Sequence, residues 1–438
     1  MKAVLAIAAA AGVMLTVAAA NGQPASGPPT PPQDVKLMTL DDCLALAAHN
    51  IDVRDSELGV ELASAMRSET RGHLGPRIDV AGAVARYTSA YELAVGGVPF
   101  RIRDPYTWRA GVTATQPLTG LFALLSEYKQ AQTGLDIALL QRDEARRDAR
   151  FRAELGYLRV LAARSLADVA RASVTQLEAQ RQQVKSSYDH EVAGRNDVLR
   201  VEIAVADARQ DVIRADGNID LSRAQLALDL GLGPQSVDVK PWDKEPVPEP
   251  VMSEQAAEAS AIEHRTAVAS ARLKLEQADA EVRAARDRLL PQIDLVLNYT
   301  HVDGEPLAQQ DAAYVGLNAS WTPWDWGSNI ASVHVARVRR EQADLARDRI
   351  ADALRMEART AVVNTNTALH AMDVAQASLA QAEENYRIVT KKHDQNIGTT
   401  FDVIDAESVL TQARVRKQTA FYDYMLARAN LRSATGGI

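Results

Sequence analysis

The chain repeats its own pattern after roughly half its length, and this repeat constrains the fold more than any single motif. The segment GPRIDV, with Pro76, lies 215 residues before LPQIDL, with Pro291. Further along, DVLRVE from Asp197 lies 205 residues before DVIDAE from Asp402. Solenoids repeat every 20–50 residues or so, and this period is much longer. The sequence therefore predicts a duplicated half-molecule whose two halves build the same elements.

The first twenty residues have the pattern of a secretory signal peptide. Lys2 gives a positive start, and residues 3–17 form a run of apolar or small residues. Small residues at 18–20 provide a cleavage site. Residues 21–37 are rich in Pro, Gly and Ser, which predicts an extended tether that buries no core.

Composition excludes several classes of function. The formal net charge is −8, with Lys and Arg interspersed among Asp and Glu, which argues against nucleic acid as a partner. The one cysteine, Cys43, cannot form a disulfide within the chain, and its neighbours predict a buried, unreactive thiol. No nucleophile elbow, phosphate loop or metal-ligand spacing occurs. We therefore expect no catalytic residues, no cofactor and no metal, so the protein is not expected to be an enzyme.

Two stretches predict helices far longer than average. Residues 118–233 contain no proline, and residues 328–397 contain neither proline nor glycine. At 1.5 Å per residue, an unbroken helix over the second stretch would be roughly 100 Å long. Each long helix reaches a short break, around Gly194 and around Gly398, and a second helical run follows. Each half therefore predicts a long helical hairpin.

Alternating polarity predicts two strands ahead of each long helix. Ile293, Leu295, Leu297 and Tyr299 fall on one side of such a strand, opposite mainly polar residues. The four predicted strands are 78–84, 108–115, 292–299 and 315–321, and polar loops at 88–104 and 301–312 join the strands of each pair.

Four strands are too few to close a membrane barrel. About eight strands make the smallest barrel that packs its interior, and an open sheet edge cannot lie in lipid. Several chains must therefore contribute strands to one barrel. Three chains would give twelve strands, with the long helices forming a matching tube, so the sequence predicts an obligate oligomer.

The chain resembles the TolC-like outer membrane channels, the outer membrane factors of efflux pumps and type I secretion systems, over residues 38–438. The motifs that carry the resemblance are LDDCLALAAHN, LPQIDL, TPWDWG, the two helix breaks, and the repeated DV(L/I) segment followed by RAxL. It implies an α+β membrane protein: a homotrimer whose twelve-stranded β-barrel, four strands per chain, continues into a long α-helical barrel built from two structural repeats.

The resemblance also implies a place and partners. The barrel lies among outer membrane lipid and the helical tunnel extends into the periplasm. A periplasmic adaptor (membrane fusion) protein and an inner-membrane transporter complete the assembly. The expected function is a passive export duct of a tripartite efflux pump. Two alternatives remain: the outer membrane component of a type I protein secretion system and, more remotely, a periplasmic coiled-coil scaffold without a pore.

In the resembled family, acidic residues after the second hairpin tip line a periplasmic aperture. The matching residues here are Asp402 and Asp405, whose i, i+3 spacing puts both carboxylates on one helical face. In a trimer they form two rings of like charge, for which raised pKa values are expected. The first half has Asp197 and Arg200 at these positions, so the charge pattern is not duplicated.

Family members dock on the adaptor through the hairpin tips. This carries over to Gly194 and Arg195 on the first tip and to Gly398 and Thr399 on the second. Alternatively, these residues act only as helix caps and turns. The chain departs from the family at Asn396, where a glycine is common, and Asn tolerates the same backbone conformation.

Aromatic residues accompany the predicted strands. Trp108, Tyr299 and Trp321 are candidates for the girdles that mark a membrane interface. Packing at the junction of barrel and tunnel is the alternative. The predicted division of the chain is a signal peptide (1–20), a tether (21–37), a first repeat (38–232), a linker or equatorial segment (233–252) and a second repeat (253–438).

Overall fold

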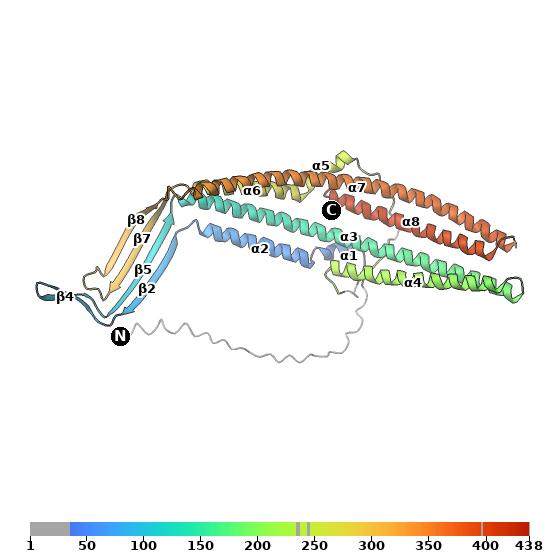
Figure 1. The fold of residues 1–438 in the computed structure, drawn as a ribbon, viewed down its shortest axis with the longest axis horizontal. Coiled ribbons are helices and arrows are strands. Elements are labelled where there is room, and N and C mark those ends of the chain that lie inside the picture. The colour runs from blue at the N-terminus through green and yellow to red at the C-terminus, as the bar shows by residue number, and fades with distance from the viewer. Residues whose placement is uncertain (1–35, 234–236, 243–245, 396, 438) are drawn as a thin grey trace.

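The computed structural model describes residues 36–233, 237–242, 246–395 and 397–437. These residues form an elongated rod of helices with a β-sheet at one end, and the last helix ends near the middle of the rod (Figure 1). The predicted signal peptide, Asn396 and nearly all of the predicted tether lie outside the described residues.

Four strands form one antiparallel sheet in the order β2-β5-β7-β8. They are β2 (Arg77–Arg86), β5 (Tyr106–Pro117), β7 (Gln292–Asp303) and β8 (Asp311–Ser320). The predicted strand pairs are confirmed, although β7 and β8 extend into the residues predicted as a loop at 301–312. Because β5 pairs with β7, the two halves join inside the sheet, and β2 and β8 are its edges.

The two faces of this sheet differ in polarity. Side chains alternate along each strand, and residues opposite one another in the register share a face. The exposed apolar residues of one face are Ile78, Val80, Val84, Val112, Leu297, Val315 and Leu317, whereas the other face carries Arg77, Asp79, Arg109, Thr113, Asn298 and Asn318. Among the described residues, no other element covers this apolar face.

Residues 88–104, predicted as a polar loop, contain a hairpin instead. Strands β3 (Tyr91–Val95) and β4 (Val98–Arg103) pair antiparallel. Gly96 and Gly97 form the turn with φ of 63° and 85°, which glycine adopts without a steric penalty. A Gly-Gly pair between alternating residues is a hairpin signal, and it corrects the prediction of a loop.

The long helices are confirmed. The part of the chain that the structure describes has eight helices: α1 (Leu40–Ala47), α2 (Ile51–Gly72), α3 (Gly120–Asp189), α4 (Arg195–Asp229), α5 (Glu254–His264), α6 (Thr266–Asp287), α7 (Ser328–Asp394) and α8 (Thr400–Ala434). Near the sheet the helices lie side by side in the order α2, α3, α6, α7. In the far half the order is α4, α3, α8, α7 (Figure 1).

The helical segment that precedes each strand pair is divided in two, α1 and α2 in the first repeat and α5 and α6 in the second. Asn50 caps α2 by accepting a hydrogen bond from the Val53 backbone N–H at 2.9 Å. The break between α5 and α6 falls at Arg265, whose backbone is extended.

In the described residues, no helix has the length and hydropathy that crossing a bilayer requires.

The middle of the rod is tied together by a short parallel sheet of β1 (Lys36–Met38) and β6 (Val237–Val239). Asp238 of β6 accepts hydrogen bonds from Arg164 of α3 and from Arg223 of α4, the latter at 2.8 Å. Part of the predicted linker at 233–252 is therefore a strand bound to both helices.

Cys43 lies buried in the hydrophobic core around this short sheet, and burial raises the pKa of its thiol to about 11.

Candidate functional site

Both hairpin tips lie at the end of the rod that is farthest from the sheet (Figure 1). They are linked by side chains, since the Arg200 guanidinium lies 5.6 Å from the centre of the Phe401 ring. A second link joins the long helices, where Gln183 donates to Asp394 at 3.2 Å. The residues that were predicted from two distant parts of the sequence therefore meet in one region.

The second tip begins α8 with a capping box. Thr399 accepts from the Asp402 backbone N–H at 3.2 Å, and the Asp402 carboxylate accepts from the Thr399 backbone N–H at 2.9 Å and its hydroxyl at 2.7 Å. This satisfies N–H groups that the first turn of a helix leaves unpaired. Thr399 thus has a defined role as the cap of α8, and Gly398 precedes it in the tip.

The candidate aperture residues Asp402 and Asp405 are both exposed, one helical turn apart. Hydrogen bonds from the Thr399 backbone and then from its hydroxyl hold the pKa of Asp402 below its ordinary value. This lowering acts within one chain, and the rise in pKa expected from a ring of like charges stays a prediction for the trimer. The cap acts directly on the carboxylate, whereas the like charges invoked for the rise belong to other copies of the chain.

The first tip has the same backbone plan with less side-chain support. The Gly194 backbone N–H donates to the Asp197 carboxylate at 3.2 Å, and Gly194 has no side chain to return a hydrogen bond. Arg195 starts α4 and is exposed. Arg200 occupies the place of Asp405 and points its charge at Phe401, so the two tips differ in both capping and charge.

A buried carboxylate lies where α8 crosses α3, and the sequence reasoning missed it. Glu407 is 4% exposed and accepts hydrogen bonds from the hydroxyls of Ser173 at 2.7 Å and Thr411 at 2.8 Å. Close by, Arg414 donates to Gln176 at 3.4 Å. The sequence around Glu407 has the pattern of an ordinary exposed polar helix face, so it did not predict a buried acid. The one hint was that the residue types of this contact recur in both halves of the sequence.

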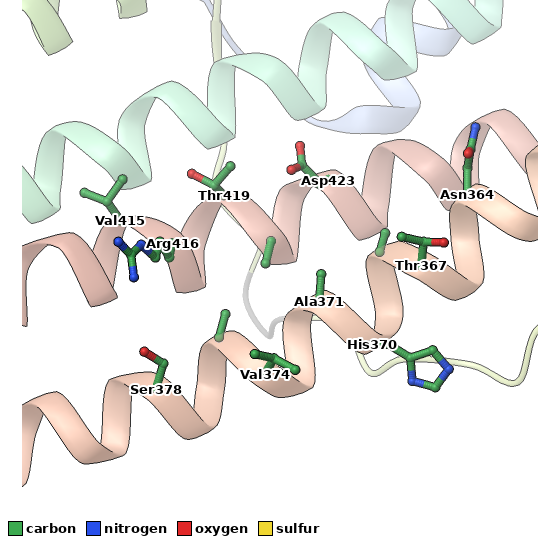
Figure 2. Close-up of a pocket in the computed structure, with 13 residues that line it drawn as sticks. Asn364, Thr367, His370, Ala371, Val374, Ser378, Val415, Arg416, Thr419 and Asp423 are labelled. Atoms are coloured by element: carbon green, nitrogen blue, oxygen red, sulfur yellow. The ribbon is translucent and has the colours of Figure 1, made fainter.

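A groove of about 850 Å³ runs between α7 and α8 in the far half of the rod. Figure 2 shows small and polar side chains along both helices. Its labelled lining includes Ala371, Val374 and Ser378 from α7 and Val415 and Thr419 from α8. The groove is an open seam between two helices, not an enclosed cavity.

The three candidate interface aromatics do not form a single level. Trp108 lies opposite Asp303 at the far end of the sheet and donates to its carboxylate at 3.0 Å. Trp321 follows the last residue of β8 at the end nearest the helices and donates to the Leu289 carbonyl at 3.2 Å. Tyr299 lies between them on the apolar face, so the structure separates these residues along the strands.

A family model described as "Outer membrane efflux protein" matches residues 45–232 and 259–437, which together make up most of the chain. The chain belongs to this outer membrane efflux protein family. It is also similar to the outer membrane efflux protein BepC of Brucella suis, with 21% identity over 355 residues that cover 80% of this chain and 76% of BepC.

Solved structures agree with the fold. The CmeC outer membrane channel of Campylobacter jejuni is similar with a TM-score of 0.79 and 16% identity, covering 91% of this chain and 85% of CmeC. The MtrE channel of Neisseria gonorrhoeae, in its open state, gives a TM-score of 0.75 and 18% identity, covering 91% and 89%. The α+β channel fold expected from the sequence is therefore confirmed.

Membership in the outer membrane efflux protein family settles three of the predictions. The protein resides in the outer membrane, its function is efflux across that membrane, and it acts as a passive channel and not as an enzyme.

Proposed function

We propose that three copies of this chain close into one outer membrane duct that serves a tripartite efflux pump. The observation that carries the proposal is the open four-stranded sheet with one apolar face. Strands β2 and β8 leave backbone groups unpaired at its edges, and lipid cannot satisfy such groups. Because β2 runs away from the helices and β8 returns toward them, β8 of one copy lies antiparallel to β2 of the next.

The height of the sheet fits a membrane. Trp108 is level with Asp303, and Trp321 is next to Ser320, which lies opposite Gln292. Eleven steps of about 3.4 Å along β7 span roughly 37 Å. At the strand tilt of 35–45° typical of such barrels, this height becomes roughly 28 Å, close to the apolar band of about 25 Å. We assign Trp108 and Trp321 to opposite girdles, with Tyr299 inside the band.

The flanks of the helical rod also require a neighbour. Leu58, Leu62 and Met66 are exposed along α2, at one side of the helical layer near the sheet. Leu345 and Met356 are exposed along α7, at the other side. Large exposed apolar surfaces mark interaction sites in folded proteins. In the trimer, α7 of one copy covers α2 of the next.

The tips form the periplasmic end of this duct. Asp402 and Asp405 of three copies would form acidic rings that constrict the aperture and favour cations. Gly194, Arg195 and Thr399 are exposed and Gly398 is half-buried beside Thr399. Together they form the surface on which a periplasmic adaptor would dock, and through the adaptor an inner-membrane transporter. The exposed apolar side chains of Val192 and Ile397 support this docking role, since they lie next to these residues.

Two adjacent residues of β8 provide a matched test. Val315 is 71% exposed on the apolar face near mid-height, and Tyr314 is 57% exposed on the polar face. Val315→Arg would place a charge in lipid at about 2–4 kcal/mol per copy, so trimers should disappear from outer membrane fractions and efflux of a fluorescent dye should be lost. Tyr314→Arg faces the lumen and should assemble and transport. Equal behaviour of the two variants would contradict the proposal.

A further inference from the structure

Three exposed tryptophans lie where the sheet meets the helices. They are Trp321, Trp324 and Trp326, with exposed fractions of 61%, 70% and 91%. All three belong to the short segment between β8 and α7, at the junction of the sheet and the rod (Figure 1). Tryptophan is a large side chain that is mostly buried on average in folded proteins. A cluster as exposed as this one marks a surface that meets something other than water.

The two outer indoles differ from the first in their hydrogen bonding. The indole N–H of Trp321 donates to the Leu289 carbonyl at 3.2 Å. Among the described residues, the indole N–H groups of Trp324 and Trp326 have no acceptor. The two rings contact each other, with centroids 6.1 Å apart. The pair therefore presents apolar rings together with unused donors, the combination that suits a layer with one apolar side and one wet side.

The backbone holds Trp326 outward in a strained conformation. Trp326 has a φ of 57° and Gly327 a φ of 84°. For a residue as bulky as tryptophan this left-handed backbone is an outlier. Asp325 fixes the turn, since its carboxylate accepts from the Asn329 backbone N–H at 2.8 Å in the first turn of α7. Strained residues persist where the surrounding structure fixes them, and they are frequent at functional positions.

The first repeat passes from strand to helix without this feature. At a shift of 206 residues, Pro117 corresponds to Pro323, Leu118 to Trp324 and Gly120 to Trp326. Helix α3 begins at Gly120 itself, whereas α7 begins two residues after Trp326. The fold therefore does not require the tryptophan pair at this turn, and its presence in the second repeat needs another reason.

The level of the pair lies just beyond the apolar band of the proposed duct. Trp321 marks the end of this band nearest the helices, and Trp324 and Trp326 follow it by three and five residues. The headgroup regions of a bilayer add roughly 5–8 Å on each side of its hydrocarbon core, which a turn of this length can span. In the proposed duct the helices extend into the periplasm, so the leaflet at this level is the periplasmic one.

Building on the proposed duct, we propose that Trp324 and Trp326 insert among the phospholipid headgroups of the periplasmic leaflet and anchor the channel at a fixed depth. The rings lie against the upper acyl carbons, and the indole N–H groups donate to phosphate or ester oxygens. Phospholipid fits better than a neighbouring copy of the chain for two reasons. The pair is continuous with the lipid-facing girdle at Trp321, and its unused donors suit a wet, polar layer.

Spin labels measure the depth of this turn. In a Cys43→Ala background, Trp326→Cys, Val315→Cys and Val247→Cys each receive a nitroxide, and the proteins are placed in vesicles of phosphatidylethanolamine and phosphatidylglycerol. Val315 lies in the apolar band, and Val247 is 78% exposed in the segment between β6 and α5. Oxygen concentrates in the apolar core and a water-soluble nickel chelate outside it. We expect the ratio of the two collision rates at Trp326 to lie between those at Val315 and Val247.

Each outcome of this measurement decides the anchor. A label at Trp326 that is as accessible to the chelate as the label at Val247 would place the turn in water and overturn the anchor. A label shielded from both oxygen and chelate would show that a neighbouring copy covers the turn, which would also overturn it. Failure of the proposed duct gives a different result, because the label at Val315 would then be accessible to the chelate or the unmodified protein would form no trimers.

Trp326→Gly gives an independent readout. Glycine adopts left-handed backbone without strain, so this variant should form trimers that are at least as stable to heat in detergent as the wild type. In vesicles of lipids brominated close to the headgroup, it should lose part of the tryptophan quenching, since bromine quenches only the indoles that it contacts. The control is Trp242→Phe, which removes a ring packed among buried residues of the rod and should leave the quenching unchanged. Equal quenching in Trp326→Gly and wild type would overturn the anchor.

Discussion

The two helical hairpins of this protein have the same plan and different surroundings. Helices α4 and α8 each have 35 residues, and each has an aspartate three residues after its N-cap. The α8 tip has a threonine cap and two exposed acids, whereas the α4 tip has a glycine cap and Arg200 in place of the second acid. Duplication thus preserved the backbone while the charges of the two tips diverged.

The hairpins also differ in what covers them. Helix α8 packs against α3 of its own chain, and its Glu407 is buried there. Helix α4 has the equivalent Glu202 exposed on the flank of the rod. One chain is therefore an incomplete unit, because a helix surface that is covered within the chain in one repeat is exposed in the other.

Removing the acids of the second tip should have the largest effect. Asp402→Ala with Asp405→Ala removes both acidic rings, so we expect a several-fold rise in single-channel conductance and weaker cation selectivity in planar bilayers. The matched control is Asp197→Ala with Arg200→Ala on the first tip, which should change conductance little. A larger change from the control pair would place the gate in the first hairpin.

The second-largest effect is expected at the buried carboxylate of Glu407. Glu407→Ala leaves the Ser173 and Thr411 hydroxyls without their acceptor at a buried seam, which costs about 1–3 kcal/mol. Thermal unfolding of the detergent-solubilised protein measures this loss. Glu407→Gln keeps the volume and an acceptor and should cost much less. If Glu202→Ala costs a comparable amount in the trimer, the two hairpins share one kind of seam. A change within about 0.5 kcal/mol for Glu407→Ala, typical of exposed positions, would refute its role.

The two helix N-caps should give smaller effects on local stability, and these effects should have opposite signs. Thr399→Ala removes the side-chain acceptor at the start of α8 and should cost about 1 kcal/mol of local stability. Gly194 has an extended backbone with φ of −82°, so Gly194→Ser fits without strain and should gain a few tenths of a kcal/mol. Hydrogen exchange of the amides in the first turns of α4 and α8 reports both effects. Opposite signs are expected, and equal protection of the two tips in wild type would be inconsistent with this difference.

The smallest effect concerns pH. Because the folded pKa of Asp402 is lowered by Thr399, its cap contributes stability above the unfolded pKa of about 3.9. That contribution is lost as the pH falls through the folded value. The protection of the amides at the start of α8, taken relative to their intrinsic exchange rate at each pH, should therefore fall in acid, and Asp402→Asn should remove this pH dependence. An acid response that survives Asp402→Asn would assign it to another group.

Much of the fold could be predicted from the residues alone. The alternation in Ile293, Leu295 and Leu297 predicted β7, and the proline-free stretches predicted α3 and α7, because periodicity and backbone restrictions are local. The β3–β4 hairpin was predicted as a loop although Gly96 and Gly97 signalled its turn. The strand β6 was missed because three residues such as Val237–Val239 carry too little pattern to distinguish a strand from a linker.

The candidate site was only partly predictable. Asp402 and Asp405 were identified through the family resemblance, and their exposure on one face agrees with the helical spacing. Within one chain the pKa of Asp402 is lowered by hydrogen bonds from Thr399, which the spacing alone does not reveal, and the rise expected for a ring of three chains stays a prediction. Glu407 was missed because burial of an acid depends on which distant helix packs over it.

The sequence by itself determined the duplication, the long helical hairpins, the strand pairs and the inequality of charge between the tips. These features follow from periodicity, from the absence of proline and glycine, and from residue identity at a fixed shift. Only the tertiary structure decided that α8 lies on α3, that Glu407 is buried against Ser173 and that the groove of Figure 2 stays open. The contact of α8 with α3 joins residues more than two hundred positions apart, such as Ser173 and Glu407, and no local pattern encodes it.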